Sequence, residues 1–377
     1  MIVRKSLEKA WFSLLLIGFI FIGVFRIFED PEKKFIRENG FTGKTTETTP
    51  SFSYTKEYYR VTKPLNLARN GTGFSDHVLF FNRVPKSGSE MLVLLLQWLQ
   101  GPNGFRHVRL PGSEKRSLSV FEQEELVEQI TNTEKAEAVP ISFDRHVYFI
   151  NFTKFDKQWP IYVNLIRDPV EKAISRFYYA RVTPDIKNPD VRYALSKGLI
   201  PSSKSPDKKF ENFEDCVMAS DPECNFITGN NYDLAIPYFC GQEPKCRILN
   251  DEWALRKAKE NVENYFPVVG ILEELNMTLA VLESKLPMFF KGVQNVYFNE
   301  LLEPHKNKNK WKPKPPPFNQ FVRSHLKNQL NYEYDFYYWI KSRLKKQYEN
   351  IIIINKKFKQ KNFNSKTGNG NHSDRLC

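Results

Sequence analysis

Cysteine and histidine are scarce in this chain, which has five cysteines and six histidines among 377 residues. No two cysteines have Cys-x-x-Cys spacing, and no histidine lies between residues 147 and 304. Structural zinc sites need closely spaced Cys and His ligands, so the sequence argues against one. No G-x-x-x-x-G-K-[ST] sequence occurs either, which argues against a nucleotide triphosphatase or a kinase of the P-loop class. No internal repeat is evident.

Positive charge is in excess, with 56 Lys and Arg against 43 Asp and Glu and a formal net charge of +13. Such a surface attracts polyanions, which could be nucleic acid, anionic lipid or an acidic polysaccharide. The chain is 41% apolar and 14% aromatic. It can therefore form one large α/β domain with accessory segments, or two smaller domains.

The N-terminus has the pattern of a membrane anchor. Residues 1–10 carry three basic residues, and residues 11–25 carry no charge. We expect a cytosolic tail over residues 1–10, a transmembrane signal anchor over residues 11–28 and a lumenal stem over residues 29–75, which are rich in Lys, Thr, Ser and Glu. A cleaved signal peptide is the alternative, but no A-x-A pattern follows the apolar run.

Glycosylation sequons and cysteine spacing agree with a lumenal location. Four Asn-x-Ser/Thr sequons begin at Asn70, Asn151, Asn276 and Asn371. Two pairs of cysteines are close in sequence, and Cys377 is left over. In an oxidising lumen we expect these pairs to form local disulfides, Cys216–Cys224 and Cys240–Cys246.

Strand and helix patterns alternate along the chain. An apolar strand over residues 77–82 precedes a polar loop and a helix over residues 90–100. A strand over 160–166 leads through Asp168, a helix N-cap, to a helix beginning at Pro169. We also expect strands over 267–271 and 146–152 and a helix over 273–286. This alternation predicts a parallel, doubly wound α/β sheet that binds its ligand at the carboxyl ends of the strands. The domain should span residues 76–350, followed by a basic, disordered tail over 351–377.

Two motifs have the composition of anion sites. The loop 83–89 reads Arg-Val-Pro-Lys-Ser-Gly-Ser, so backbone amides, hydroxyls and a lysine converge at a helix N-terminus. Because Lys86 precedes Gly88, the loop suits a 5′-phosphosulfate better than β- and γ-phosphates. In the second motif, Arg167 at a strand end and Ser175 in the next helix could face one phosphate. An ordinary strand-to-helix turn and a surface arginine are the plain alternatives.

Together these motifs resemble those of sulfotransferases that use 3′-phosphoadenosine 5′-phosphosulfate (PAPS). More closely, the chain resembles the uronic acid 2-O-sulfotransferases, which comprise the heparan sulfate enzyme, the dermatan/chondroitin uronyl enzyme and the insect pipe-type proteins. The resemblance covers residues 76–350 and includes the segments 145–152, 160–169, 236–242, 253–255, 269–275 and 332–334. The uronyl and pipe-type branches fit better than the heparan sulfate branch.

The resemblance implies a P-loop-like doubly wound fold, a Golgi type II membrane protein and a homotrimer. It implies sulfate transfer from PAPS, without a metal, to the 2-hydroxyl of a uronic acid in a glycosaminoglycan or a related glycan. His146 would be the general base and Lys86 would neutralise charge on the bridging oxygen. The implied donor contacts are Lys86, Ser87, Gly88 and Ser89 at the 5′-phosphosulfate and Arg167 and Ser175 at the 3′-phosphate. Arg83 would grip the uronate carboxylate.

Two residues depart from the family pattern, and the roles of two other features stay open. Asp144 stands where the heparan sulfate enzyme has a second histidine, and Met91 stands where relatives often have a hydroxyl. The lysine-rich segment 306–314 could close over the donor or simply be solvated. His146 could also be a structural histidine at a strand end. A non-catalytic lumenal glycan-binding protein is the alternative function, while the anchor and sequons argue against a nucleic-acid partner.

Overall fold

The computed structural model describes residues 75–180, 210–301 and 319–367, with side chains as far as residue 357. These residues all belong to one compact unit, Thr62–Cys377. The expected anchor, almost all of the stem, the lysine-rich segment 306–314, Asn70, Asn371 and Cys377 lie outside the described residues. Within the described ranges, no helix has the length and apolar character that a membrane span requires.

Five parallel strands form a single sheet, as the sequence predicts. They are β1 (Val78–Asn82), β2 (Arg106–Arg109), β3 (Ile141–Arg145), β4 (Ile161–Ile166) and β5 (Val268–Ile271), in the order β2-β3-β1-β4-β5. The strand β1 is central and wholly buried, with β3 on one side and β4 on the other. The carboxyl ends of these three strands therefore meet at one edge, where doubly wound sheets bind their ligands.

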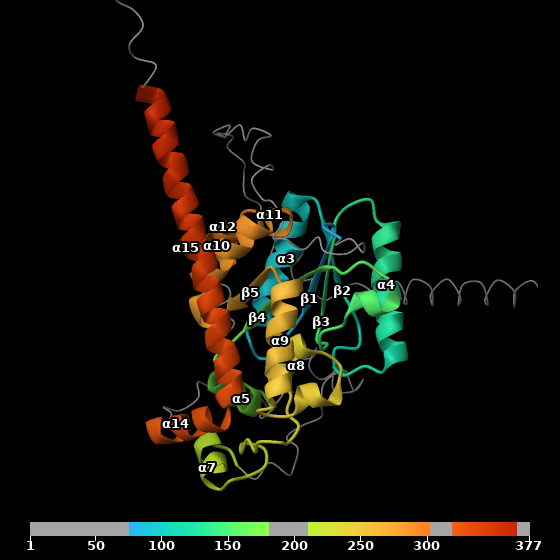
Figure 1. The fold of residues 1–377 in the computed structure, drawn as a ribbon, viewed down its shortest axis with the longest axis vertical. Coiled ribbons are helices and arrows are strands. Elements are labelled where there is room, and N and C mark those ends of the chain that lie inside the picture. The colour runs from blue at the N-terminus through green and yellow to red at the C-terminus, as the bar shows by residue number, and fades with distance from the viewer. Residues whose placement is uncertain (1–74, 181–209, 302–318, 368–377) are drawn as a thin grey trace, which may run out of the picture. The chain divides into compact units, whose positions relative to one another are not determined.

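Helices cover both faces of the sheet (Figure 1). On one face α3 (Ser89–Asn103) packs against α11 (Pro287–Phe290), and α10 (Leu275–Lys285) packs against α11 and α12 (Val293–Asn295). On the other α8 (Pro237–Cys240) packs against α9 (Glu252–Tyr265), while α4 (Val120–Ala136) lies toward the β2 side. The helices α5 (Pro169–Tyr179), α7 (Phe213–Met218) and α14 (Gln320–Gln329) pack together at one end. Short helical turns are η2 (Phe152–Phe155), η3 (Pro244–Arg247), η4 (Leu272–Glu274) and η5 (Val296–Leu301).

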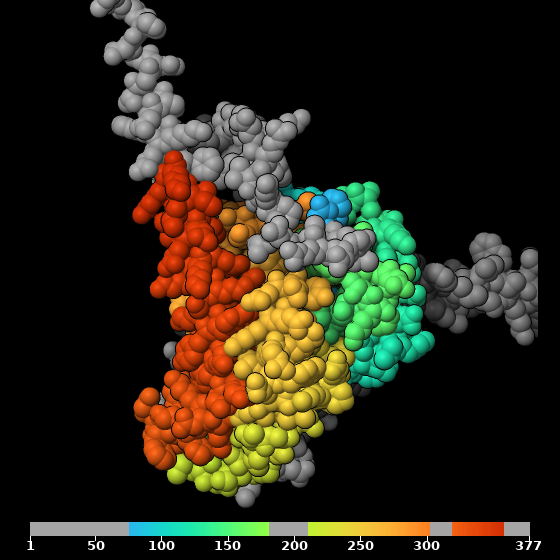
Figure 2. Space-filling model, viewed as in Figure 1, coloured from blue at the N-terminus to red at the C-terminus, as the bar shows by residue number. Residues whose placement is uncertain are grey.

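The long helix α15 (Asn331–Thr367) packs against β5, α9 and α10. Figure 2 shows it lying alongside α9 on the visible face. The expected disordered tail is wrong for residues 351–367, because α15 continues through them without a break. No proline or glycine occurs between Asn331 and Thr367, and Gly368 follows directly. The chain thus contains no helix breaker before the point where the helix ends.

The expected strand over residues 146–152 is also corrected. The strand β3 lies earlier, at Ile141–Arg145, and pairs with β1 and β2. Residues 147–150 are buried but form no ladder, because their apolar side chains pack into the core instead of extending the sheet. His146 therefore follows the carboxyl end of β3. By contrast, the predicted start of α5 is confirmed, since Asp168 Oδ1 accepts a hydrogen bond of 3.0 Å from Glu171 N.

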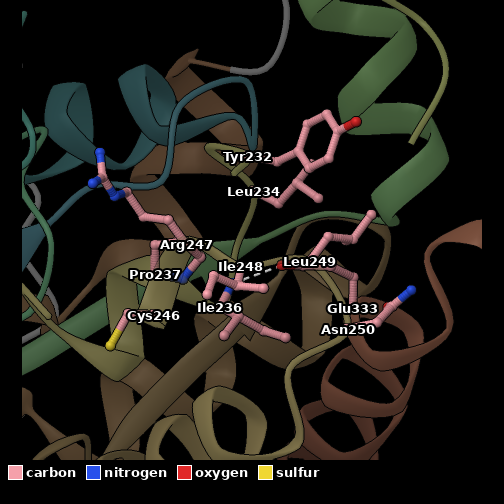
Figure 3. A pocket seen from close by; sticks show the side chains of 10 residues that line it. All are labelled: Tyr232, Leu234, Ile236, Pro237, Cys246, Arg247, Ile248, Leu249, Asn250 and Glu333. Atoms are coloured by element: carbon pink, nitrogen blue, oxygen red, sulfur yellow. Dashed lines mark hydrogen bonds between the residues drawn. The ribbon is translucent and has the colours of Figure 1, made fainter. Parts of the chain in front are cut away.

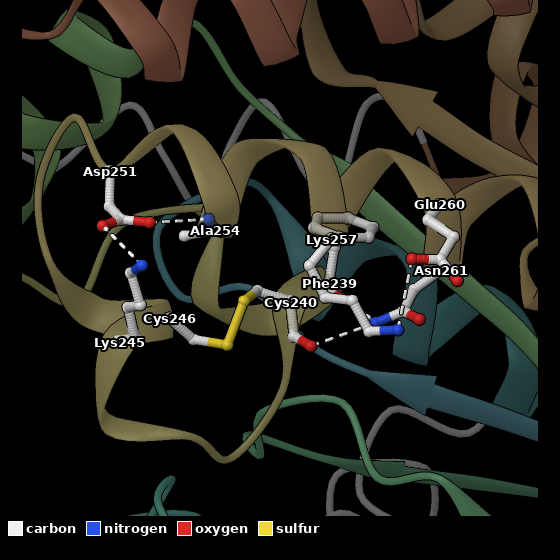
Figure 4. The surroundings of a disulfide bond; sticks show 9 residues. All are labelled: Phe239, Cys240, Lys245, Cys246, Asp251, Ala254, Lys257, Glu260 and Asn261. Carbon is white, nitrogen blue, oxygen red and sulfur yellow. Dashed lines mark hydrogen bonds and ion pairs between the residues drawn. A yellow bond between two sulfur atoms is a disulfide. The ribbon is translucent and has the colours of Figure 1, made fainter.

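Both expected disulfides are confirmed, Cys216–Cys224 and Cys240–Cys246. Figure 4 shows the second one joining the end of α8 to η3. Beside it, Asn261 of α9 donates hydrogen bonds to the carbonyl oxygens of Phe239 at 2.8 Å and Cys240 at 3.0 Å. The bridge and the buried amide together fix the short helix α8 against α9.

Candidate active site

The carboxyl edge of the sheet brings together segments that are far apart in sequence. The loop 83–89 follows β1, His146 follows β3, Arg167 follows β4 and Glu273 follows β5. Because β3, β1 and β4 are adjacent in the sheet, the first three segments are neighbours in space. Almost all of the predicted chemistry therefore lies at one edge.

The loop 83–89 is shaped for an anion at the N-terminus of α3. Gly88 has a φ of 79°, and a Cβ there would lie 2.6 Å from Leu272 Cδ1, so only glycine fits. In the described part of the chain, the backbone amides of Ser87, Gly88 and Ser89 donate to no protein acceptor. These amides and the helix dipole favour a phosphate or sulfate group. The hydroxyl of Ser87 is already used, since it donates to Val84 O at 2.7 Å.

Lys86 extends from this loop to the end of α5. Its backbone has a φ of 64°, a left-handed conformation that is uncommon outside glycine and typical of functional loops. Its Nζ lies 3.5 Å from the centre of the Tyr179 ring, within the range of a cation–π contact. The exposed ring of Tyr179 therefore holds the ammonium group beside the loop.

Arg83 is buried and its guanidinium is held by carboxylates. Nη1 lies 2.6 Å from Asp144 Oδ2, and Nη2 is paired with Glu90 and lies 3.4 Å from Ser89 Oγ. The predicted grip of Arg83 on an acceptor carboxylate would have to replace one of these partners. That role stays a prediction, and the geometry assigns Arg83 to the framework of the site.

Asp144 is the centre of this buried network. Besides Arg83, its carboxylate contacts His107 Nε2 at 3.1 Å and Arg109 Nε at 3.5 Å, and His107 Nδ1 lies 2.8 Å from Ser142 Oγ. Burial by itself would raise the pKa of Asp144. The hydrogen bond from His107 and the charges of Arg83 and Arg109 outweigh burial and hold this pKa below its usual range. Asp144, which stands where the heparan sulfate enzyme has a second histidine, therefore has buried partners of its own.

His146 has the protonation state that a general base requires. Its Nδ1 lies 2.9 Å from the carbonyl oxygen of Arg83. A carbonyl can only accept, so Nδ1 carries the proton and Nε2 carries the lone pair. Burial, with the positive charges of Arg83 and Arg116, lowers the pKa of His146 to about 4. The ring is therefore neutral at neutral pH, and its backbone N–H is held by Ser113 Oγ at 3.3 Å.

Arg167 and Ser175 occupy the positions that the sequence predicts, at the end of β4 and two turns into α5. Arg167 is half-buried, and its nearest carboxylates are Glu171 at 3.3 Å and Glu273 at 3.9 Å. A phosphate bound there would compete with these carboxylates. Whether Arg167 and Ser175 hold a phosphate stays a prediction.

Sequence reasoning missed several residues of this edge, namely Glu90, His107, Arg109, Tyr179, Arg323 and Tyr334. Arg323 Nη2 contacts Glu171 at 2.5 Å, and the Tyr334 hydroxyl donates to Asp168 at 2.9 Å. A signal existed for His107 and Arg109, because alternate polar residues in a strand share one face. No local pattern pointed to Arg323, which comes from a distant helix.

Two further predicted features fall outside the edge. Asn151 caps η2 by accepting a hydrogen bond from Thr153 N at 3.1 Å, and Asn276 is exposed on α10; glycosylation of either stays a prediction.

Across the described ranges, no group of three His, Cys, Asp or Glu could hold a metal ion.

The pocket in Figure 3 is lined by none of the residues predicted for catalysis, donor binding or acceptor binding. It lies between η3 and the start of α15, and its lining includes Arg247, Asn250 and Glu333. The Glu333 carboxylate accepts hydrogen bonds of 3.0 Å from the amides of Ala235 and Ile236. The pocket has room for about one water molecule. It is therefore too small for a nucleotide or a sugar.

Comparison with known proteins agrees with the geometry of this edge. A model described as "Sulfotransferase family" matches residues 73–340. The chain is 35% identical over 286 residues to the uronyl 2-sulfotransferase of Homo sapiens, covering 76% of this chain and 65% of that protein. It is 33% identical to the uronyl 2-sulfotransferase homolog pip of Drosophila melanogaster, covering 74% of this chain and 54% of that protein. The chain thus spans less than two thirds of the length of these relatives.

A second group of relatives is also similar. The heparan sulfate 2-O-sulfotransferase 1 of Gallus gallus is 33% identical over 224 residues, which cover 59% of this chain and 58% of that protein. The uronyl relatives match a longer part of this chain than the heparan sulfate relatives do.

Proposed function

Because the chain belongs to the sulfotransferase family, we propose that it transfers a sulfuryl group from PAPS to the 2-hydroxyl of a uronic acid in a glycosaminoglycan or a related glycan. The observation that carries this proposal is the neutral His146, with its Nε2 lone pair, beside an anion-binding loop at the same sheet edge. The similarity to uronyl and heparan sulfate 2-O-sulfotransferases supports the acceptor class.

The described residues fit the donor. The backbone amides of Ser87, Gly88 and Ser89 are available for the 5′-phosphosulfate, and Lys86 supplies a positive charge beside them. The proposed ligands of the 3′-phosphate are Arg167, which follows β4, and Ser175 in α5. Bound there, PAPS supplies the activated sulfuryl group.

His146 moves the proton in the transfer step. Its Nε2 takes the proton of the acceptor hydroxyl as that oxygen forms a bond to sulfur. The bond between sulfur and the bridging phosphate oxygen breaks, and its electron pair remains on that oxygen. Lys86 stabilises the charge that develops there. The products are the sulfated sugar and 3′-phosphoadenosine 5′-phosphate (PAP).

The membrane anchor at residues 11–28, the lumenal stem and a Golgi location belong to this proposal. The supporting observations are the uncharged run after a basic N-terminus and the two disulfides, which are typical of an oxidising compartment. Immunofluorescence of the tagged full-length chain, combined with protease protection in microsomes, tests the location and the orientation. A cytosolic, protease-sensitive domain would reject both.

Tyr179 should act as a positioning residue for Lys86. We expect Tyr179→Leu to lower kcat about three- to thirtyfold, because the ammonium loses a cation–π contact. Tyr179→Phe keeps the ring and should keep most of the rate. Steady-state kinetics and PAP affinity of both variants check this expectation. If Leu and Phe behave alike, the ring does not position Lys86.

The activity itself is tested with the purified full-length chain, labelled PAPS and a panel of desulfated heparan, dermatan and chondroitin chains. We expect transfer to at least one polymer, and the position of the label identifies the reacting hydroxyl. Label on a 6-hydroxyl of the amino sugar would reject the 2-hydroxyl assignment. Binding of PAPS and polymer without transfer to any chain would favour a non-catalytic glycan-binding protein.

A further inference from the structure

Arg145, the last residue of β3, forms no ion pair with a carboxylate of the described residues. The other arginines that end or follow strands at this edge have carboxylate partners, which are Asp144 at 2.6 Å for Arg83, Glu90 at 2.7 Å for Arg109 and Glu171 at 3.3 Å for Arg167. Among the described residues, no carboxylate oxygen lies within 4.0 Å of the Arg145 guanidinium. Glu114 and Glu122 act on it only from farther away.

The hydrogen bonds of Arg145 are also incomplete. Nη2 donates to Gly112 O at 3.1 Å, while Nε is buried and has no acceptor. Burial lowers the pKa of Arg145 despite the two distant glutamates, yet a guanidinium stays protonated in proteins. Within the described part of the chain, Arg145 is therefore a half-buried positive charge whose desolvation no adjacent carboxylate offsets.

The neighbouring loop is built around this guanidinium. Gly112 has a φ of 77°, and a Cβ on it would lie 2.7 Å from Arg145 Nη2. Ser113, the next residue, accepts the hydrogen bond from the His146 amide at 3.3 Å. The same short loop thus contacts the Arg145 guanidinium and the backbone of His146, the residue that follows Arg145.

We propose that Arg145 binds an oxyanion of the acceptor glycan, and so determines that the acceptor is acidic. This inference rests on the proposed function, and it adds the residue that selects the acceptor. Carboxylates and sulfates both match the paired N–H donors of a guanidinium. The anion is either the uronate carboxylate or a sulfate ester on a nearby sugar. A neutral glycan would leave the charge of Arg145 uncompensated.

The test compares Arg145→Gln, Arg145→Lys and wild type, as full-length chains, on three forms of one polymer: intact, carboxyl-reduced and desulfated. We expect Arg145→Gln to raise KM for the intact polymer about tenfold or more, as loss of a charge-assisted hydrogen bond implies. Its kcat and PAP affinity should stay near wild type, and Arg145→Lys should lie between the two. Arg256→Gln, which removes the same charge from an exposed site on α9, is the matched control and should leave KM unchanged.

The acceptor forms identify the anion. If the effect of Arg145→Gln disappears on the carboxyl-reduced polymer, Arg145 binds the carboxylate; if it disappears only on the desulfated polymer, Arg145 binds a sulfate. Equal KM values for wild type and Arg145→Gln on all forms would overturn the proposal. So would a joint fall of kcat, PAP affinity and melting temperature in both Arg145 variants, because Arg145 would then only support the loop.

Equilibrium binding separates this proposal from the proposed function. Polymer affinity is measured for the same variants in the presence of PAP, without any transfer. If the wild-type chain transfers no sulfate but Arg145→Gln still binds the intact polymer about tenfold more weakly, the function fails and the Arg145 site stands. If both proteins bind the polymer equally, the site is rejected whatever the activity.

Discussion

Replacing His146 by alanine is expected to lower the rate of sulfate transfer by about 10²- to 10⁴-fold, the usual contribution of a general base. The structure provides the reason, because the Arg83 carbonyl fixes the proton on Nδ1 and leaves Nε2 as the proton acceptor. PAP affinity should remain close to wild type, since the amides of the loop 83–89 do not depend on the imidazole. Transfer assays and calorimetric titration with PAP measure the two quantities separately.

The control for this variant is His325→Ala, which removes an exposed histidine on α14 and should change neither quantity. A parallel loss of transfer and PAP affinity in His146→Ala would make His146 a structural residue. The titration of the ring gives an independent check. Without ligand, NMR should show a pKa of about 4 for His146, and PAP should raise it, because nearby phosphate charge favours the imidazolium.

Replacing Asp144 by alanine is expected to destabilise the protein by about 3–5 kcal/mol, the cost of removing one partner from a buried charge pair. Asp144 is fully buried and contacts Arg83, Arg109 and His107. Without it the Arg83 guanidinium would keep only the more exposed Glu90 as a carboxylate partner. Urea unfolding of the full-length chain measures the loss.

The matched control is Asp335→Ala, which removes a more exposed aspartate paired with Lys259 at 2.6 Å and should cost about 1 kcal/mol or less. If Asp144→Ala costs no more than this control, the buried network does not stabilise the fold. The pH dependence follows from the lowered pKa of Asp144. Its contribution is fully present above the unfolded pKa of about 3.9 and is lost as the pH falls through the lower folded value.

Local sequence patterns predicted several of the structural elements that surround the candidate site. The strand before the loop 83–89, the capped helix after Asp168 and both disulfides could be predicted because each depends on residues close in sequence. The strand near His146 is misplaced, because the mostly apolar residues 147–152 look like a strand, whereas the ladder runs through Ile141–Arg145, where Ser142, Asp144 and Arg145 interrupt the apolar pattern. Composition predicts a disordered tail over 351–377, but residues 351–367 contain no proline or glycine and α15 continues through them.

The sequence by itself determined the parallel α/β class, the polar loop at the start of α3 and, through its motifs, the family. These features follow from short-range chemistry, because turn geometry, helix capping and disulfide closure involve neighbours along the chain. Only the tertiary structure decided which charges are paired. It buried Arg83 against Asp144, placed the Lys86 ammonium over the Tyr179 ring and, among the described residues, left Arg145 without a carboxylate partner. Such pairings join residues from different strands and helices, so they depend on the packing of the sheet, which no local pattern specifies.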